Sequence, residues 1–240
     1  MLYLPSNWEF RHINFTLVEI KNETKMEKIL IAGATGSTGK RIIEILNSSN
    51  SFEPVALIRK EEQKEVFEDM GVETVLGDLE KNLDHAVKGI DRVIFAAGSG
   101  SKTGDDKTIA VDQEGAKRLI DASKKAKIKK FIMLSAIGAD ETSENDDLKT
   151  YLNAKSNADK YLRDSGLTYT IVRPGSLTDD LGLAKVKLAE NLNERGEISR
   201  DDVAFLLVMS LADPLAKNKT FEALEGKEPI KNALIDISQA

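Results

Sequence analysis

Short apolar runs alternate with helical segments along most of this 240-residue chain, and this alternation constrains the fold more than any other feature. The runs that we expect to be strands cover residues 28–32, 55–58, 72–76, 93–97, 129–134, 168–172 and 220–224. The segments that we expect to be helices cover residues 37–47, 61–70, 81–87, 106–125, 147–165 and 200–212, the last with Ser199 as its N-cap. Such alternation is typical of a parallel sheet with helices on both faces. The sequence therefore predicts a doubly wound α/β fold.

One domain accounts for residues 26–240, because no repeat, low-complexity tract or linker divides them. The first 25 residues are a separate segment without the basic start and apolar stretch of a secretory signal. Its acidic residues Glu9, Glu19 and Glu23 argue against an organelle transit peptide. Residues 13–17 alternate like a short strand, but Met26 stands directly before the first full strand. We expect residues 1–25 to be an extension that the domain does not need.

Composition excludes several kinds of site and partner. The chain has no cysteine and only two histidines, so we expect no disulfide, no metal site and no Ser-His-Asp triad. The net charge of −6 argues against a nucleic-acid partner, and no apolar run approaches the roughly 18 residues of a membrane helix. We therefore expect a cytoplasmic protein that binds neither nucleic acid nor membrane, with a homo-oligomer or a protein partner left open.

A glycine-rich turn, Gly33-Ala-Thr-Gly36-Ser-Thr-Gly39, joins the first expected strand to the first expected helix. Gly33 permits a tight turn, Gly36 lets backbone N–H groups approach a pyrophosphate, and Gly39 lets the helix pack closely on its strand. The helix N-terminus adds positive potential. This order of strand, turn and helix favours a Rossmann-like nucleotide site over a purely structural turn. The expected cofactor contacts in the turn are Gly33, Thr35, Gly36, Ser37, Thr38 and Gly39.

The residues after the second expected strand indicate which nucleotide binds. A fold that prefers NAD usually has Asp or Glu there to hold the ribose 2′-hydroxyl, whereas this chain has Arg59 and Lys60. Because two cations suit a 2′-phosphate, we expect NADP(H) rather than NAD(H) as the cofactor. The alternative is a solvated pair that Glu61 and Glu62 partly neutralise.

Two further strand ends supply candidate cofactor contacts. Asp78 and Leu79 follow the third expected strand, where the adenine amino group could be met. Ala96, Ala97 and Gly98 end the fourth expected strand, where small residues let a cofactor lie close to the backbone. Ordinary turn chemistry explains both segments equally well.

Together with two later motifs, these segments resemble a known family. The matching motifs are Gly33-Ala-Thr-Gly36-Ser-Thr-Gly39, Gly77-Asp78-Leu79, Ser135, Tyr151-Leu-Asn-Ala-Lys155 and Arg173-Pro174-Gly175. They are similar to motifs of the atypical short-chain dehydrogenases/reductases. Within that family, the chain is most similar to the small, single-domain NAD(P)H-binding subgroup of NmrA-like and NAD-dependent epimerase/dehydratase sequences. The resemblance covers residues 26–226.

The resemblance implies a role for each catalytic candidate. Tyr151 would donate a proton to a carbonyl as hydride arrives, and Ser135 would orient the carbonyl oxygen. Lys155 would bind the nicotinamide ribose and make the tyrosine a better proton donor. The family usually has an Asn in the helix after the fourth strand that supports a proton relay. Asp112 holds that position here, and an ionised acid accepts hydrogen bonds but cannot donate them, which puts the full relay in doubt.

Helical spacing gives the tyrosine and the lysine a second interpretation. An i, i+3, i+4, i+7 stripe of a core-facing helix contains Leu148, Tyr151, Leu152, Lys155, Ala158 and Leu162. A lysine on such a stripe either extends its head to the edge or meets a partner, and a bound ribose is one such partner. The alternative to a catalytic pair is a structural amphipathic pair.

Ser135 lies at the end of the fifth expected strand and Arg173 at the end of the sixth. Both are at the carboxyl edge, where open parallel sheets bind ligands. By the resemblance, Arg173 would line the nicotinamide or substrate side. The alternative roles are a cap of the turn before Gly138 for Ser135 and an ion pair with an acidic neighbour for Arg173.

The function expected from these residues is that of an NADP(H)-dependent oxidoreductase acting on a small carbonyl or hydroxyl compound, with isomerase or dehydratase chemistry as a variant. A non-catalytic NADP(H) sensor that acts through protein contacts is an alternative of another class. A protein-assembly or RNA-associated factor is a weaker third. The substrate is not specified, because only residues 176–199 and the C-terminal tail are left to shape its pocket.

Overall fold

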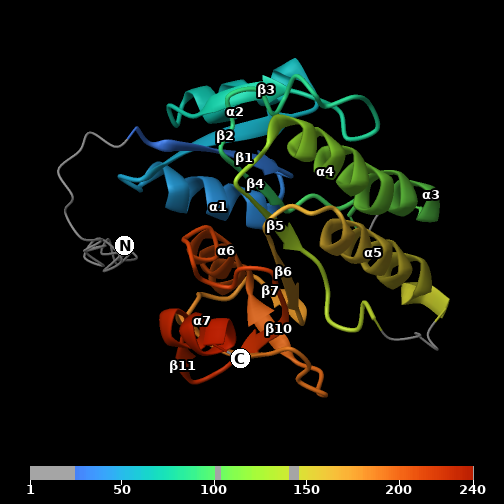
Figure 1. Ribbon diagram of the computed structural model, residues 1–240, viewed down its shortest axis with the longest axis vertical. Coiled ribbons are helices and arrows are strands. Elements are labelled where there is room, and N and C mark those ends of the chain that lie inside the picture. Colours follow the sequence, from blue (N-terminus) through green and yellow to red (C-terminus); the bar gives the residue numbers. More distant parts are fainter. Residues whose placement is uncertain (1–24, 101–103, 141–145, 240) are drawn as a thin grey trace, which may run out of the picture.

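In the computed structural model, which describes residues 25–100, 104–140 and 146–239, a large twisted sheet lies between two layers of helices (Figure 1). Its strands are β1 (Glu27–Ala32), β2 (Phe52–Ile58), β3 (Glu73–Leu76), β4 (Arg92–Phe95), β5 (Lys130–Leu134), β6 (Tyr169–Pro174), β8 (Lys185–Ala189), β10 (Lys219–Glu225) and β11 (Glu228–Pro229). Two short strands, β7 (Ser176–Thr178) and β9 (Glu197–Ser199), form a separate parallel pair.

The order of strands across the sheet is β11-β8-β10-β6-β5-β4-β1-β2-β3. From β3 to β10 each neighbouring pair is parallel, so the carboxyl ends of these strands meet at one edge. This confirms the doubly wound, Rossmann-like architecture. The seven strands expected from the sequence are all parallel, and the sheet is extended by β8, a strand that was not expected, which runs antiparallel to β10 and to β11.

The helical segments are α1 (Ser37–Asn47), the 3₁₀ turn η2 (Glu61–Gln63), α2 (Glu65–Glu68), α3 (Asp105–Lys107), the π-helical η3 (Thr108–Gln113), α4 (Glu114–Ala126), α5 (Asp146–Asp164), α6 (Arg200–Met209) and α7 (Ile230–Gln239). Ser199 caps α6 as expected, since its side chain accepts a hydrogen bond from the backbone N–H of Asp202. No helix within the described part of the chain is long and apolar enough to cross a membrane.

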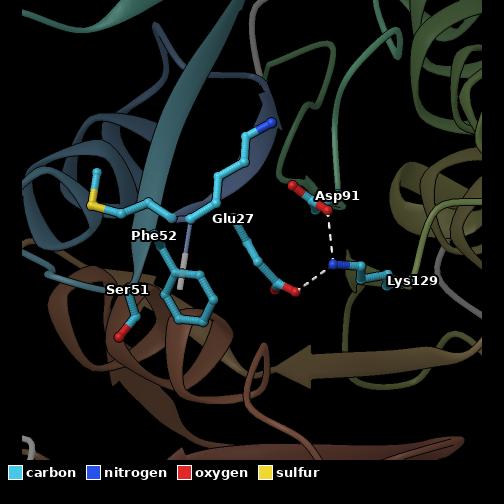
Figure 2. Close-up of a pocket in the computed structure, with 7 residues that line it drawn as sticks. Glu27, Ser51, Phe52, Asp91 and Lys129 are labelled. Atoms are coloured by element: carbon cyan, nitrogen blue, oxygen red, sulfur yellow. Dashed lines mark hydrogen bonds and ion pairs between the residues drawn. The ribbon is translucent and has the colours of Figure 1, made fainter. Parts of the chain in front are cut away.

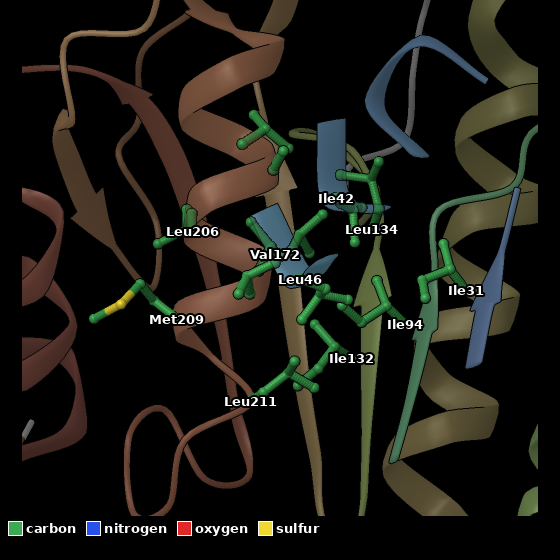
Figure 3. Packing of buried hydrophobic residues seen from close by; sticks show 14 of the residues in the cluster. Ile31, Ile42, Leu46, Ile94, Ile132, Leu134, Val172, Leu206, Met209 and Leu211 are labelled. Atoms are coloured by element: carbon green, nitrogen blue, oxygen red, sulfur yellow. The ribbon is translucent and has the colours of Figure 1, made fainter. Parts of the chain in front are cut away.

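Alternation along each strand divides the core into two layers. Ile29 and Ile31 of β1 point into the layer under α1, α6 and α7, whereas Leu30 and Ala32 point into the layer under α4 and α5. Figure 3 shows the first layer, in which side chains from adjacent strands meet those of α1 and α6, such as Leu206. Both faces of the sheet are therefore buried, as expected of a central parallel sheet.

Several predicted elements differ from the structure. The helix expected at residues 81–87 is wrong: these residues form turns, in which the Asn82 side chain accepts a hydrogen bond from the N–H of Asp84 at 3.0 Å. The helix expected at 61–70 is broken into η2 and α2, and the one expected at 106–125 contains a π-helical stretch. Residues 176–199, which with the C-terminal tail were left to shape a substrate pocket, supply β7, β8 and β9, and the tail forms β11 and α7.

Candidate functional site

The glycine turn packs against the end of β4. Gly33 has a φ of +88°, and a Cβ atom there would lie 2.6 Å from the backbone nitrogen of Ala97. A Cβ on Gly39 would lie 2.0 Å from the carbonyl oxygen of Gly33, which the backbone N–H of Gly36 also approaches at 3.0 Å. The turn therefore requires glycine for a positive φ at its first position and for close helix approach at its last.

The N-terminus of α1 is open toward this edge of the sheet. Gly36 is its N-cap residue, no side chain caps it, and its first turn contains no acidic residue. Thr35, Gly36 and Ser37 are exposed, whereas Thr38 is buried. Because uncapped N–H groups and the helix dipole attract anions, this end of α1 fits the pyrophosphate of a dinucleotide.

Arg59 and Lys60 follow β2 at the same edge, and their side chains are exposed. Gln63 fixes their backbone, because its Oε1 atom accepts hydrogen bonds from the N–H groups of both residues, at 2.9 and 3.0 Å. Within the described segments, no carboxylate forms an ion pair with either side chain, Glu61 and Glu62 included. Two cations without a carboxylate partner among the described residues thus lie at the carboxyl edge of the sheet, directly after β2.

The other expected cofactor contacts lie at neighbouring strand ends. Asp78 stabilises its own turn, since its Oδ1 accepts a hydrogen bond from the N–H of Glu80 at 3.0 Å. The carbonyl of Leu79 accepts a hydrogen bond from Arg118 at 3.0 Å. Ala96 continues the ladder of β4, with its N–H donating to Ala32 at 2.8 Å. The structure therefore gathers these segments at one edge but also gives Asp78 and Leu79 local structural roles.

Tyr151 and Lys155 lie one turn apart on α5, with the Lys155 Nζ atom 5.6 Å from the centre of the tyrosine ring. Lys155 is 4% exposed, and its Nζ lies 2.9 Å from Oδ1 of Asp112 and 3.3 Å from the carbonyl oxygen of Leu134. Burial lowers the pKa of Lys155, but Tyr151 and Asp112 together raise it above the usual value. Lys155 is thus a buried ammonium with a carboxylate partner. Leu148, expected on the buried stripe, is instead 46% exposed.

Asp112 belongs to the π-helical segment η3 and is 1% exposed. Besides its ion pair with Lys155, its Oδ2 atom accepts a hydrogen bond from the N–H of Ser99 at 2.8 Å. π-Helical turns are frequent at functional sites, where the wider turn redirects a side chain. In this structure Asp112 is the counter-ion of Lys155 and links it to the segment that follows β4.

Ser135 follows β5 and is buried. Its hydroxyl donates to Oδ2 of Asp159 at 2.8 Å, and the same oxygen accepts from Nε of Arg173 at 2.9 Å. Arg173 also donates to Asp140 at 2.7 Å, so it forms the ion pair with acidic neighbours that was its alternative role. Burial raises the pKa of Asp159, although Arg173 and Ser135 oppose this.

Asp159 is the site residue that sequence reasoning missed. It follows Lys155 by four residues, as Lys155 follows Tyr151, so the three share one face of α5. The sequence did carry a signal for Asp159, because three titratable residues follow one another at i, i+4 and i+8 along a helix stripe that is otherwise largely apolar.

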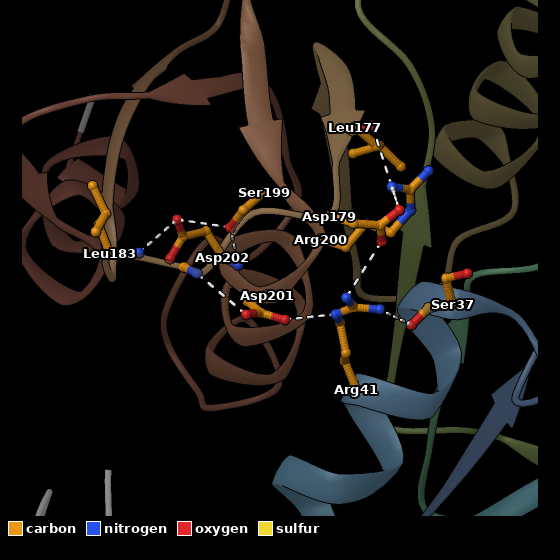
Figure 4. A network of polar contacts seen from close by, with 10 residues as sticks. Ser37, Arg41, Leu177, Asp179, Leu183, Ser199, Arg200, Asp201 and Asp202 are labelled. Atoms are coloured by element: carbon orange, nitrogen blue, oxygen red, sulfur yellow. Dashed lines mark hydrogen bonds and ion pairs between the residues drawn. The ribbon is translucent and has the colours of Figure 1, made fainter. Parts of the chain in front are cut away.

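The segment after β7 borders the N-terminus of α1 (Figure 4). Arg41 of α1 binds Asp179 at 3.4 Å and Asp201 at 2.5 Å, and Arg200 binds Asp179 at 3.1 Å. These ion pairs hold the segment beside the first turn of α1. Leu181, which follows Asp179 by two residues in this segment, has 76% of its surface exposed.

A separate hollow of about 440 Å³ lies at the opposite edge of the sheet (Figure 2). There Lys129 binds Glu27 at 2.7 Å and Asp91 at 2.8 Å. These residues precede or begin β1, β4 and β5, whereas open parallel sheets bind ligands at the carboxyl ends of their strands. The hollow is therefore not part of the candidate site.

Comparison with known proteins agrees with the geometry of the carboxyl edge. The sequence profile of the family described as NAD(P)H-binding matches residues 33–214, which include the glycine turn, Tyr151 and Lys155. The chain belongs to this NAD(P)H-binding family.

Individual relatives cover nearly the whole domain. The chain is 45% identical over 211 residues to "Uncharacterized sugar epimerase YhfK" of Bacillus subtilis, covering 86% of this chain and 98% of that protein. A Bacillus halodurans structure assigned as an NAD-dependent epimerase/dehydratase superposes with a TM-score of 0.84 and 38% identity, covering 88% of this chain and 99% of that one. Sanguinarine reductase of Eschscholzia californica is 28% identical over 260 residues, covering 90% of this chain and 95% of the reductase. The family thus includes reductases and proteins named as epimerases.

Proposed function

We propose that the protein is an NADP(H)-dependent oxidoreductase that transfers hydride to or from a small carbonyl or hydroxyl compound. The observation that carries this proposal is the pair formed by Tyr151 and Lys155. The lysine is buried beside the end of β5 and the half-buried tyrosine lies one turn away, at the edge that also holds the glycine turn. Reductase activity in a relative, sanguinarine reductase, supports the same class of reaction.

The cofactor would supply the hydride, and the chain's own groups would handle the proton. Tyr151 would donate its phenolic proton to the substrate oxygen during reduction and take one from a hydroxyl during oxidation. The Lys155 ammonium lies close enough to the ring to stabilise negative charge that develops on the phenol oxygen. Asp112 keeps that ammonium charged and fixed in place.

Exchange of the tyrosine tests the catalytic proposal. Tyr151→Phe should lower kcat at least about 100-fold, because general acid–base catalysis typically contributes that much, and should leave NADPH affinity nearly unchanged. Tyr161→Phe is the matched control, since Tyr161 lies on the same helix but bonds Asp121 at the surface. Oxidation of NADPH with a panel of simple carbonyl compounds gives the rates. Equal rates for the two variants would refute the catalytic role.

The cofactor preference has its own test. Arg59→Ala should weaken NADPH binding about tenfold or more, because it removes a charge-assisted contact to the 2′-phosphate, and should leave NADH binding nearly unchanged. Lys64→Ala is the control, since this exposed lysine on the following turn pairs with Glu68. Fluorescence titration measures both affinities. Equal losses for NADPH and NADH would count against the phosphate contact.

One observation favours a second function, that of an NADP(H) sensor without turnover. The groups expected to serve a substrate already have internal partners: Ser135 donates to Asp159, and Lys155 pairs with Asp112. A sensor needs the glycine turn and Arg59 but does not need Tyr151. NADPH binding that Arg59→Ala weakens, together with no turnover in the wild type, would favour the sensor.

A further inference from the structure

The cluster around Asp159 joins α5 to β5 and β6 behind the catalytic candidates. Asp159 is fully buried, and its Oδ2 atom accepts hydrogen bonds from both Ser135 and Arg173. Its Oδ1 atom has no hydrogen-bond partner among the described residues. The acid is thus held on one side by two donors from neighbouring strands.

A serine hydroxyl has a single proton and two acceptor lone pairs. A carboxylate can only accept, so an ionised Asp159 makes the serine the donor in the 2.8 Å bond between Ser135 and Asp159. Any ligand oxygen that reaches Ser135 would then meet lone pairs, and it would have to bring a proton of its own. A hydroxyl group satisfies this requirement and a carbonyl group does not.

We propose that Asp159 is a positioning residue that accepts the hydrogen bond donated by the Ser135 hydroxyl. Ser135 then offers only lone pairs to a substrate, and the site favours the hydroxyl form of the substrate over the carbonyl form. The preference for a hydroxyl compound rests on the function proposed above, whereas the orientation of Ser135 does not. Asp159 acts through Ser135 and does not itself touch the substrate.

Burial raises the pKa of Asp159, and the two cations that face it oppose this rise. Arg173 approaches from β6, and Lys155 lies one turn away on α5. Asp140 contacts Arg173 from the far side and does not contact Ser135. Asp140 therefore offers a matched acid in the same network that leaves the serine untouched.

The first measurement follows the Asp159 carboxyl directly and needs no turnover. In protein labelled with carbon-13 at aspartate Cγ, the Asp159 signal is assigned by its loss in Asp159→Asn and is titrated with pH. Ser135→Ala should raise its midpoint by about one pH unit, because it removes one hydrogen bond to the charged form. Ser123→Ala is the control, a buried serine outside the network. An unchanged midpoint in Ser135→Ala would overturn the proposal.

The second measurement tests the preference, with cyclohexanol and cyclohexanone as probes. Cyclohexanol is titrated into the NADPH-loaded protein and cyclohexanone into the NADP⁺-loaded protein, so that neither probe can react. The dissociation constant of the ketone divided by that of the alcohol should be greater than one. Ser135→Ala should reduce this ratio about tenfold, whereas Asp140→Asn should preserve it. Asp159→Asn should also preserve it, because an amide oxygen can still accept from Ser135. An equal ratio in the wild type and Ser135→Ala would refute the preference.

The two proposals fail in different ways. NADPH binding without binding or turnover of any carbonyl or hydroxyl probe would refute the proposed function and, with it, the hydroxyl preference. A shifted Asp159 midpoint in Ser135→Ala would still establish the orientation of Ser135. Probe turnover with an unshifted midpoint would leave the oxidoreductase intact and remove Asp159 from its positioning role.

Discussion

Lys130, at the start of β5, is a fully buried lysine at the sheet edge opposite the candidate site. Its Nζ atom donates to the carbonyl oxygen of Leu215 at 2.6 Å and lies 3.8 Å from Asp213. Burial lowers the pKa of Lys130 from 10.5 to about 8, and Asp213 only partly opposes this.

This residue should give the stability of the protein a characteristic pH dependence. Between pH 8 and 10 the unfolded chain binds the Lys130 proton more strongly than the folded chain, so unfolding becomes less favourable as the pH rises. Lys130→Met should lack this gain. Urea unfolding at pH 8 and 10 should show a rise in the free energy of unfolding about 2 kcal/mol larger for the wild type than for the variant. Parallel changes in the two proteins would contradict the prediction.

At the scale of the element, the N-cap of α6 was predicted from the sequence. Ser199 caps α6 through the N–H of Asp202 at 3.0 Å, and Asp202 in turn holds the backbone of Leu183 and Ala184 at 3.1 and 2.7 Å. The cap therefore stabilises both the helix and the segment beside the site.

Ser199→Ala should lower the free energy of unfolding by about 1 kcal/mol, the usual cost of losing an N-cap. Ser48→Ala is the control, because Ser48 is an exposed serine at the C-terminal end of α1 whose hydroxyl donates to the carbonyl oxygen of Glu44. This substitution should change the free energy of unfolding by less than about 0.5 kcal/mol. Urea denaturation measures the free energy of unfolding of both variants, provided that its dependence on urea concentration has the same slope as in the wild type. Similar losses in the two variants would show that the cap contributes nothing special.

Elements set by local chemistry were predictable, and those set by distant partners were not. The glycine turn and α5 follow from turn chemistry and helical spacing. By contrast, Asn82 diverts residues 81–87 into turns, and β8 becomes a strand only because β10 and β11 pair with it. The same holds in the site: an ion pair with an acidic neighbour was the alternative role for Arg173, but which acid it meets depends on α5 lying beside β6.

At the scale of the molecule, the sheet starts at Glu27, which pairs with Phe52 in the first rung of the β1–β2 ladder. We propose that residues 1–25 are not needed for the fold. A chain that begins at Met26 should keep its melting temperature and its NADPH affinity. A chain that begins at Leu30 loses half of β1 and should not fold, which makes it the matched control. Circular dichroism and NADPH titration compare them, and unfolding of the Met26 chain would refute the proposal.

The two outer strands of the sheet limit how copies of this protein could associate. β11 is two residues long, and its Pro229 has no N–H to offer to another strand. On the other side β3 has only four residues, among them the charged Glu73, which holds Lys28. Short, charged or proline-bearing borders resist strand addition and therefore amyloid-like stacking. We therefore expect copies of this protein to associate through surfaces other than these two borders.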